Sequence, residues 1–153
     1  MKNKKESEIR IINQMKLSVP SISANESVCR AIVSVFLAQL DPTLEELADV
    51  KCAVSEAVTN CIVHAYKGSV GTIYISAYLY SDDTVKIEIR DKGCGIPDVR
   101  QAMQPLYTTS PADERSGMGF SVMQTFTDSL KVSSRVGHGT RVILKKRLSR
   151  AVI

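Results

Sequence analysis

The chain has 153 residues, of which 44% are hydrophobic and 24% charged, a composition typical of one globular domain that can bury a core. The net charge of +4 comes partly from basic runs at residues 2–5 and 145–147, and only 5% of residues are aromatic, so we expect no direct contact with nucleic acid. We see no signal peptide and no apolar run of about 18 residues, which argues against a membrane protein. Four cysteines without Cys-x-x-Cys spacing favour reduced thiols in a cytoplasmic protein.

The start of the chain predicts a tail, a strand and a helix. We expect residues 1–8 to form a flexible basic tail and residues 9–150 to form a single domain. Alternating apolar residues over 15–19 predict a strand, which Pro20 ends. Ser23 and Glu26 have the spacing of a capping box at the start of the following helix.

The two faces of this first helix carry different residues. The face predicted to be buried carries Val28, Ala31, Ile32, Val35 and Phe36. The opposite face carries Arg30, Val33 and Leu37. A partner protein would explain the apolar side chains on that second face, although scattered exposed apolar residues are also common. The second face is therefore a candidate partner-binding surface.

A longer helix is predicted from Thr43 to about Tyr66, with a second capping box at Thr43 and Glu46 and a terminator at Gly68. Its apolar stripe comprises Leu44, Leu47, Val50, Val54, Val58, Cys61, Ile62 and Ala65. Away from the stripe, Glu56, Asn60 and His64 follow one another at four-residue steps. A carboxylate can accept a proton and a carboxamide oxygen can bind a hard cation, but the same pattern also fits a solvated face.

Two strands at 72–80 and 85–90 alternate in polarity and are joined by a short turn, which predicts an antiparallel hairpin. The hairpin runs directly into Asp91-x-Gly93-x-Gly95. A buried carboxylate there could accept a hydrogen bond from an exocyclic amino group such as that of adenine, and the glycines would let a flat ligand approach the backbone. The alternative is an ordinary loop in which glycine supplies positive φ.

Residues 98–116 predict a loop with short helical pieces, followed by a helix that opens at Ser116-Gly117-Met118-Gly119. Free N–H groups at such a helix start favour phosphate, and Arg115 could meet a terminal phosphate with its planar guanidinium. The pattern is neither a P-loop nor a dinucleotide-binding fingerprint, and an ordinary helix start remains an alternative. A closing hairpin around Gly137 and Gly139 completes the chain. Hairpins with helices gathered on one side predict an α+β protein, a two-layer α/β sandwich with a mixed, mostly antiparallel sheet.

Taken in order, Glu56-x-x-x-Asn60, Asp91-x-Gly93-x-Gly95, Gly117-x-Gly119 and Gly139-Thr140 resemble the ATP-binding GHKL superfamily of gyrase, Hsp90, histidine kinases and MutL. The resemblance implies that the loop 98–116 is a mobile lid over the nucleotide. Longer stretches, including residues 39–43, 55–60, 104–106 and 114–120, resemble the sporulation anti-sigma F factor family (SpoIIAB) from about residue 15 to residue 148. The basic extension before this region departs from the pattern.

The resemblance to this family implies an ATP-dependent protein serine/threonine kinase that uses Mg²⁺ and forms a homodimer. Its members sequester a sporulation sigma factor from RNA polymerase and phosphorylate a serine of an anti-anti-sigma protein. Carried over, Glu56 would be the general base, Asn60 the Mg²⁺ ligand and Asp91 the residue that reads adenine. The remaining nucleotide contacts would be Gly93, Gly95, Ile96, Thr108, Thr109, Arg115, Ser116, Gly117, Met118, Gly119 and Thr140. His64 matches a position often occupied by histidine, with no assigned chemistry.

Three other interpretations are compatible with parts of the pattern. A histidine kinase would need a phosphoacceptor histidine upstream of the nucleotide motifs, and neither His64 nor His138 lies there. A stress-response anti-sigma kinase of the same family shares every catalytic motif. A non-catalytic module that binds ATP is the third possibility, but nucleotide binding alone would not require Glu56.

Overall fold

The computed structural model describes residues 7–105 and 119–149, and the remaining residues lie outside the described part. The elements, in chain order, are β1 (Ile11–Pro20), α1 (Ala24–Leu37), a 3-10 turn η1 (Ala38–Leu40), α2 (Leu44–Asn60), a π-helical turn η2 (Cys61–Ala65), β2 (Thr72–Tyr80), β3 (Thr84–Asp91), α3 (Val99–Ala102), α4 (Gly119–Phe126), β4 (Ser129–Arg135) and β5 (Gly139–Arg147). None of the described helices is both long and apolar enough to span a membrane.

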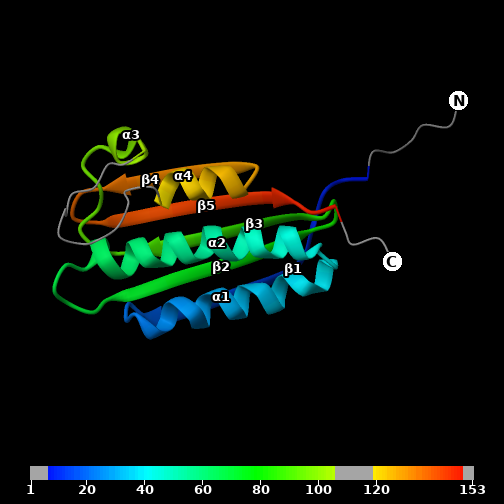
Figure 1. Ribbon diagram of the computed structural model, residues 1–153, viewed down its shortest axis with the longest axis horizontal. Helices are drawn as coiled ribbons and strands as arrows, with labels where there is room; N and C mark the ends of the chain where they lie inside the picture. Colours follow the sequence, from blue (N-terminus) through cyan, green and yellow to red (C-terminus); the bar gives the residue numbers. More distant parts are fainter. Residues whose placement is uncertain (1–6, 106–118, 150–153) are drawn as a thin grey trace, which may run out of the picture.

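The five strands form one sheet in the order β1-β2-β3-β5-β4, and each of the four pairings is antiparallel. Alternate residues of each strand face the core, as in β3, where Val85, Ile87 and Ile89 are buried. Helices α1, α2 and α4 lie against one face of this sheet (Figure 1). The predicted α+β two-layer sandwich is therefore confirmed, with an antiparallel sheet in the described strands where a mixed one was expected.

The two ends of the sheet are made of different parts of the chain. At one end, Ile11 pairs with Tyr80, and Arg147 pairs with the first residue of β3. At the other end, Asp91 pairs with Ile73, and β5 begins at Gly139. The chain therefore enters and leaves the sheet at the end that is remote from Asp91.

Helix α2 lies at the centre of the helical layer, between α1 and α4 (Figure 1). The predicted apolar stripe is largely confirmed, because Val50, Val54 and Val58 are buried against the sheet. The exception is Leu44, which is 87% exposed at the first residue of the helix. Small side chains complete the packing, since Ala53 and Ala57 are also buried and allow close approach of the neighbouring elements.

The predicted faces of α1 are wrong. Val33 and Leu37, expected on an open partner surface, are 1% and 0% exposed, whereas Val35, expected in the core, is 73% exposed. The buried row is Cys29, Val33 and Leu37, which recur at four-residue steps and so share one side of the helix. Valine and isoleucine occur on both sides of this helix, so apolar character alone did not identify the side that packs.

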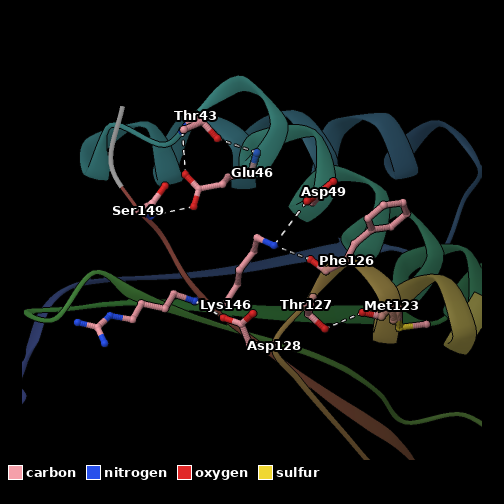
Figure 2. A network of polar contacts seen from close by, with 10 residues as sticks. Thr43, Glu46, Asp49, Met123, Phe126, Thr127, Asp128, Lys146 and Ser149 are labelled. Atoms are coloured by element: carbon pink, nitrogen blue, oxygen red, sulfur yellow. Dashed lines mark hydrogen bonds and ion pairs between the residues drawn. The ribbon is translucent and has the colours of Figure 1, made fainter. Parts of the chain in front are cut away.

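The two predicted capping boxes also differ in outcome. Ser23 already has helical backbone angles and its side chain makes no capping bond, so the first box is wrong. At the start of α2 both bonds are present: Thr43 Oγ1 accepts from Glu46 N at 3.1 Å, and Glu46 Oε1 accepts from Thr43 N at 3.0 Å. Glu46 Oε2 also accepts from Ser149 N at 2.8 Å, which ties α2 to the segment after β5 (Figure 2).

Lys146 makes a second tie between the sheet and the helical layer. Its Nζ donates to the carbonyl of Phe126 at the end of α4, at 3.1 Å, and lies 3.5 Å from Asp49 Oδ2 on α2 (Figure 2). The side chain is only 16% exposed, so the ion pair is partly shielded from water. Together these contacts fix the positions of α2, α4 and β5 relative to one another.

Candidate functional site

Asp91 lies at the end of β3 in the inward-facing phase of the strand and is 6% exposed. Its Oδ1 accepts hydrogen bonds from the backbone N–H groups of Gly93 at 2.9 Å and Thr140 at 3.2 Å. Its Oδ2 accepts from the Cys61 thiol at 3.5 Å. The carboxylate therefore joins the loop after β3, the start of β5 and the end of α2 at one point.

The thiol of Cys61 was not predicted as part of the site. Burial raises its pKa well above the usual range, and the neighbouring Asp91 raises it further, so the thiol stays protonated and can donate. Cys61 opens the π-helical turn η2 directly after Asn60. Such turns are frequent at functional sites, and here the turn begins at the residue whose thiol contacts the carboxylate.

The loop that follows Asp91 packs directly on the end of this helix. Cys94 N donates to the carbonyl of Ala65 at 2.8 Å, and Lys92 N donates to Tyr66 Oη at 2.7 Å. A Cβ at Gly93 would lie 2.1 Å from the same carbonyl oxygen of Ala65, so no larger residue fits without moving the backbone. Glycine is thus required at 93 by protein packing, and its predicted contact with a ligand stays a prediction.

A second set of contacts joins this loop to the closing hairpin. Gly95 has φ +75°, and a Cβ there would lie 2.3 Å from the carbonyl oxygen of Arg135. Ile96 N donates to Ser134 Oγ at 2.7 Å, and Ser134 Oγ also lies 2.8 Å from Thr140 Oγ1. The predicted residues Gly95, Ile96 and Thr140 are therefore brought together through Ser134, which no sequence pattern identified.

Glu56 and Asn60 lie beside the start of α4. A Cβ built at Gly119 would lie 3.1 Å from Glu56 Oε2 and 3.5 Å from Asn60 Oδ1. The first residue of α4, a glycine, therefore faces the two polar side chains of α2 that the spacing singled out. Asn60 in turn precedes Cys61, whose thiol contacts Asp91, so the contacts at Gly119 and at Asp91 are made by the same end of α2.

Several predicted residues are not brought to this region. Val33 and Leu37 are buried in α1, and Arg30 lies on the same helix in an ion pair with Glu26 at 3.1 Å. Most of the predicted lid lies outside the described residues. So do six of the predicted nucleotide contacts: Thr108, Thr109, Arg115, Ser116, Gly117 and Met118. His64 contributes its backbone carbonyl, which accepts from Cys94 Sγ at 3.3 Å. Its side chain still has no assigned chemistry.

Comparison with known proteins places this arrangement in a family. The profile of the histidine kinase-like ATPase domain matches residues 20–146. An anti-sigma F factor of Caldanaerobacter subterraneus subsp. tengcongensis is 55% identical over 138 residues, which cover 90% of this chain and 96% of that protein. An anti-sigma F factor of Priestia megaterium is 51% identical over 138 residues, with 90% and 94% covered.

Among solved structures, the RsbU and RsbW domains of Rv1364c from Mycobacterium tuberculosis match with a TM-score of 0.66 at 21% identity, over 92% of this chain and 35% of that one. This likeness shows the fold alone. The fold, the site and the matching profile define a histidine kinase-like ATPase domain. Within that class, the chain belongs to the anti-sigma F factor family.

Proposed function

We propose that the protein is an anti-sigma factor and an ATP-dependent protein serine/threonine kinase. It binds ATP with Mg²⁺, sequesters a sporulation sigma factor of the sigma F type, and phosphorylates a serine of its anti-anti-sigma antagonist. The observation that carries the proposal is that Glu56 and Asn60 face Gly119, while Cys61, next to Asn60, contacts Asp91, in a chain of the anti-sigma F factor family.

The surroundings of Asp91 suit adenine. Backbone N–H groups occupy Oδ1, whereas Oδ2 receives only a long bond from a thiol, which is a weak donor. A carboxylate oxygen can accept more than one hydrogen bond, so Oδ2 has capacity for the exocyclic amino group of adenine. Bound ATP supplies the phosphoryl group, and the residues of this chain hold and orient it.

Asn60 fits a Mg²⁺ site in which the protein supplies few of the ligands. Its carboxamide oxygen is a neutral, hard ligand, and Mg²⁺ usually keeps waters and substrate phosphate oxygens for most of its coordination. No cluster of three or more His, Cys, Asp or Glu side chains suited to a metal occurs among the described residues. We therefore propose that Mg²⁺ is held by Asn60 only together with the nucleotide.

The proposed general base is Glu56. It lies one helical turn before Asn60 on the same side of α2, and both side chains face Gly119. The hydroxyl of an acceptor serine loses its proton as the bond to phosphorus forms, and a carboxylate within reach can accept it. A non-catalytic ATP-binding module would have no use for this carboxylate.

The role of Glu56 is tested with Glu56→Gln, which keeps the shape and removes the basicity. We expect the variant to bind Mg·ATP as the parent does, while single-turnover phosphorylation of the anti-anti-sigma protein slows by about 10²- to 10⁴-fold. Glu45→Gln, on an exposed turn of the same helix, is the matched control and should react at the parental rate. Parental phosphorylation by Glu56→Gln at saturating ATP would show that Glu56 is not the base.

The proposed partner surface is smaller than the sequence predicted, because Val33 and Leu37 are buried and cannot contact a partner. Arg30 remains, with a side chain that is 40% exposed, and arginine is enriched among residues that dominate interfaces. Co-purification with sigma factors in the presence of ATP or ADP distinguishes a sporulation partner from a stress-response one. Light scattering of the full chain tests the homodimer that the family resemblance implies.

A further inference from the structure

The sheet has a second face, on the side away from α1, α2 and α4 (Figure 1). Its side chains come from the strand positions that alternate with the buried ones, such as Lys86, Glu88 and Arg90 in β3. The register places residues of neighbouring strands in rows across this face, for example Tyr74, Arg90 and Arg141. The described helices leave this face uncovered, and many of its long side chains are exposed.

Positive charge is concentrated on this face. We define the basic sheet face by the eight basic strand residues on it: Lys16, Lys86, Arg90, Lys131, Arg135, Arg141, Lys145 and Arg147. Among the strand residues that share these positions, Glu88 is the single acidic one, so eight positive charges and one negative charge give +7. The whole chain carries +4, so the remainder of the molecule is net negative.

The basic residues are set directly against one another. Arg90 pairs with Arg141 in the sheet register, and Lys86 pairs with Lys145. Like charges directly opposite on neighbouring strands are destabilising. Glu88 offsets part of this repulsion, because its carboxylate contacts the Arg141 guanidinium at 2.6 and 3.0 Å. An anionic surface laid on the face would offset the rest.

Two tyrosines on this face narrow the choice of partner. Lys86 Nζ lies 4.8 Å from the centre of the Tyr78 ring, and Arg90 and Lys92 lie 4.9 and 5.0 Å from the centre of the Tyr74 ring. Single-stranded nucleic acid binds open sheets by stacking its bases on free aromatic rings. Here the faces of both tyrosine rings are occupied by Lys or Arg side chains, so less ring surface is open for base stacking. The same contacts hold the positive charges in position to bind the carboxylates of a partner.

We propose that the basic sheet face binds an acidic surface of a partner protein, one whose Asp and Glu side chains match the rows of Arg and Lys. Complementary charge would give specificity and fast association. A second copy of this chain is a poor occupant, because two faces of +7 repel each other. The face lies across the sheet from Arg30, so it is a separate surface and does not depend on the proposed kinase activity.

The test uses a fluorescein-labelled, glutamate-rich helical peptide of about 20 residues as the probe, with the full-length protein and fluorescence anisotropy at low ionic strength. The triple variant Lys86→Gln/Arg90→Gln/Lys145→Gln should bind the peptide roughly 10-fold more weakly than the parent, since each exposed ion pair contributes a modest amount. The control triple Arg10→Gln/Lys51→Gln/Lys67→Gln removes the same charge elsewhere and should change the affinity less than about 2-fold.

A second face variant, Lys16→Gln/Lys131→Gln/Lys145→Gln, alters exposed residues only and keeps the test decisive if the first triple is unstable by circular dichroism. Amide shifts on peptide titration should map to β2, β3 and β5. An equal loss in the face and control triples would overturn the proposal, because net charge alone would then explain binding. Tighter binding of a single-stranded oligonucleotide than of the peptide would overturn it in favour of nucleic acid.

Discussion

Replacing Asp91 by Asn separates recognition of adenine from stability of the fold. In the parent, Oδ1 accepts the N–H groups of Gly93 and Thr140 at 2.9 and 3.2 Å. The side-chain oxygen of Asn can keep both bonds, so the loop after β3 retains its anchor. The Asn amide then places an NH₂ group where Oδ2 was, and a donor replaces the acceptor that we assign to adenine. Loss of one such contact costs about 1–3 kcal/mol, which lowers the affinity for ATP about 5- to 150-fold.

Asp91→Ala provides the contrast, since it removes the acceptor of both backbone N–H groups. Each donor left unpaired away from water costs about 1–3 kcal/mol, so the free energy of unfolding should fall by roughly 2–6 kcal/mol. Urea unfolding measures the stability and titration calorimetry measures ATP binding. Glu88→Gln, three residues earlier on the other side of the sheet, controls for loss of a negative charge.

Two results would refute this reasoning. Parental ATP affinity in a folded Asp91→Asn protein would show that Oδ2 does not read the base. Equal stability of Asp91→Ala and Asp91→Asn would show that the bonds to Oδ1 do not anchor the loop. The first result concerns the ligand and the second concerns the protein, so they can fail independently.

Three further predictions concern stability, measured by urea unfolding. Gly93→Ala should lower the free energy of unfolding by about 3 kcal/mol or more, because the new Cβ would lie 2.1 Å from the Ala65 carbonyl oxygen. The control Gly137→Ala, at a position with φ +79° and open space around it, should cost about 1–2 kcal/mol. Burial raises the pKa of the Cys29 thiol from 9.0 to about 11, so the unfolded chain loses a proton that the folded protein keeps. The urea midpoint should therefore fall as the pH rises from about 9 to about 11, and Cys29→Ala should flatten this decline. Thr43→Ala removes the side-chain acceptor of the Glu46 N–H, one of the two bonds of the capping box, and should cost about 1 kcal/mol, seen as a drop of a few degrees in Tm.

The strands were predictable because alternation leaves little choice once one face is buried. The residues of β2 and β3 alternate without exception between buried and partly exposed or exposed positions, as the sequence indicated. The faces of α1 were not predictable in the same way. Cys29 is fully buried and Val28 is 41% exposed, although the branched side chain is the one that apolar patterning selects.

The site divides along a similar line. Asp91 and the glycines after it follow from short spacing in the chain, which a sequence displays directly. Cys61 contacts Asp91, 30 positions away, and Ser134 binds the N–H of Ile96, 38 positions away, so the sequence around each residue does not mark these contacts. The glycines have a further reason that sequence alone could not supply, since the crowding at Gly93 arises from the end of α2.

The placement of the two ends of the sheet has a consequence for modular assembly. The chain enters at Ile11 and leaves at Arg147 on one side of the molecule, while Asp91 and Gly139 lie on the other. An affinity tag, a fluorescent reporter or a fused domain attached beyond either point would start away from the candidate site. The same geometry would let selection join this unit to other domains on one polypeptide without obstructing the passage of ligands.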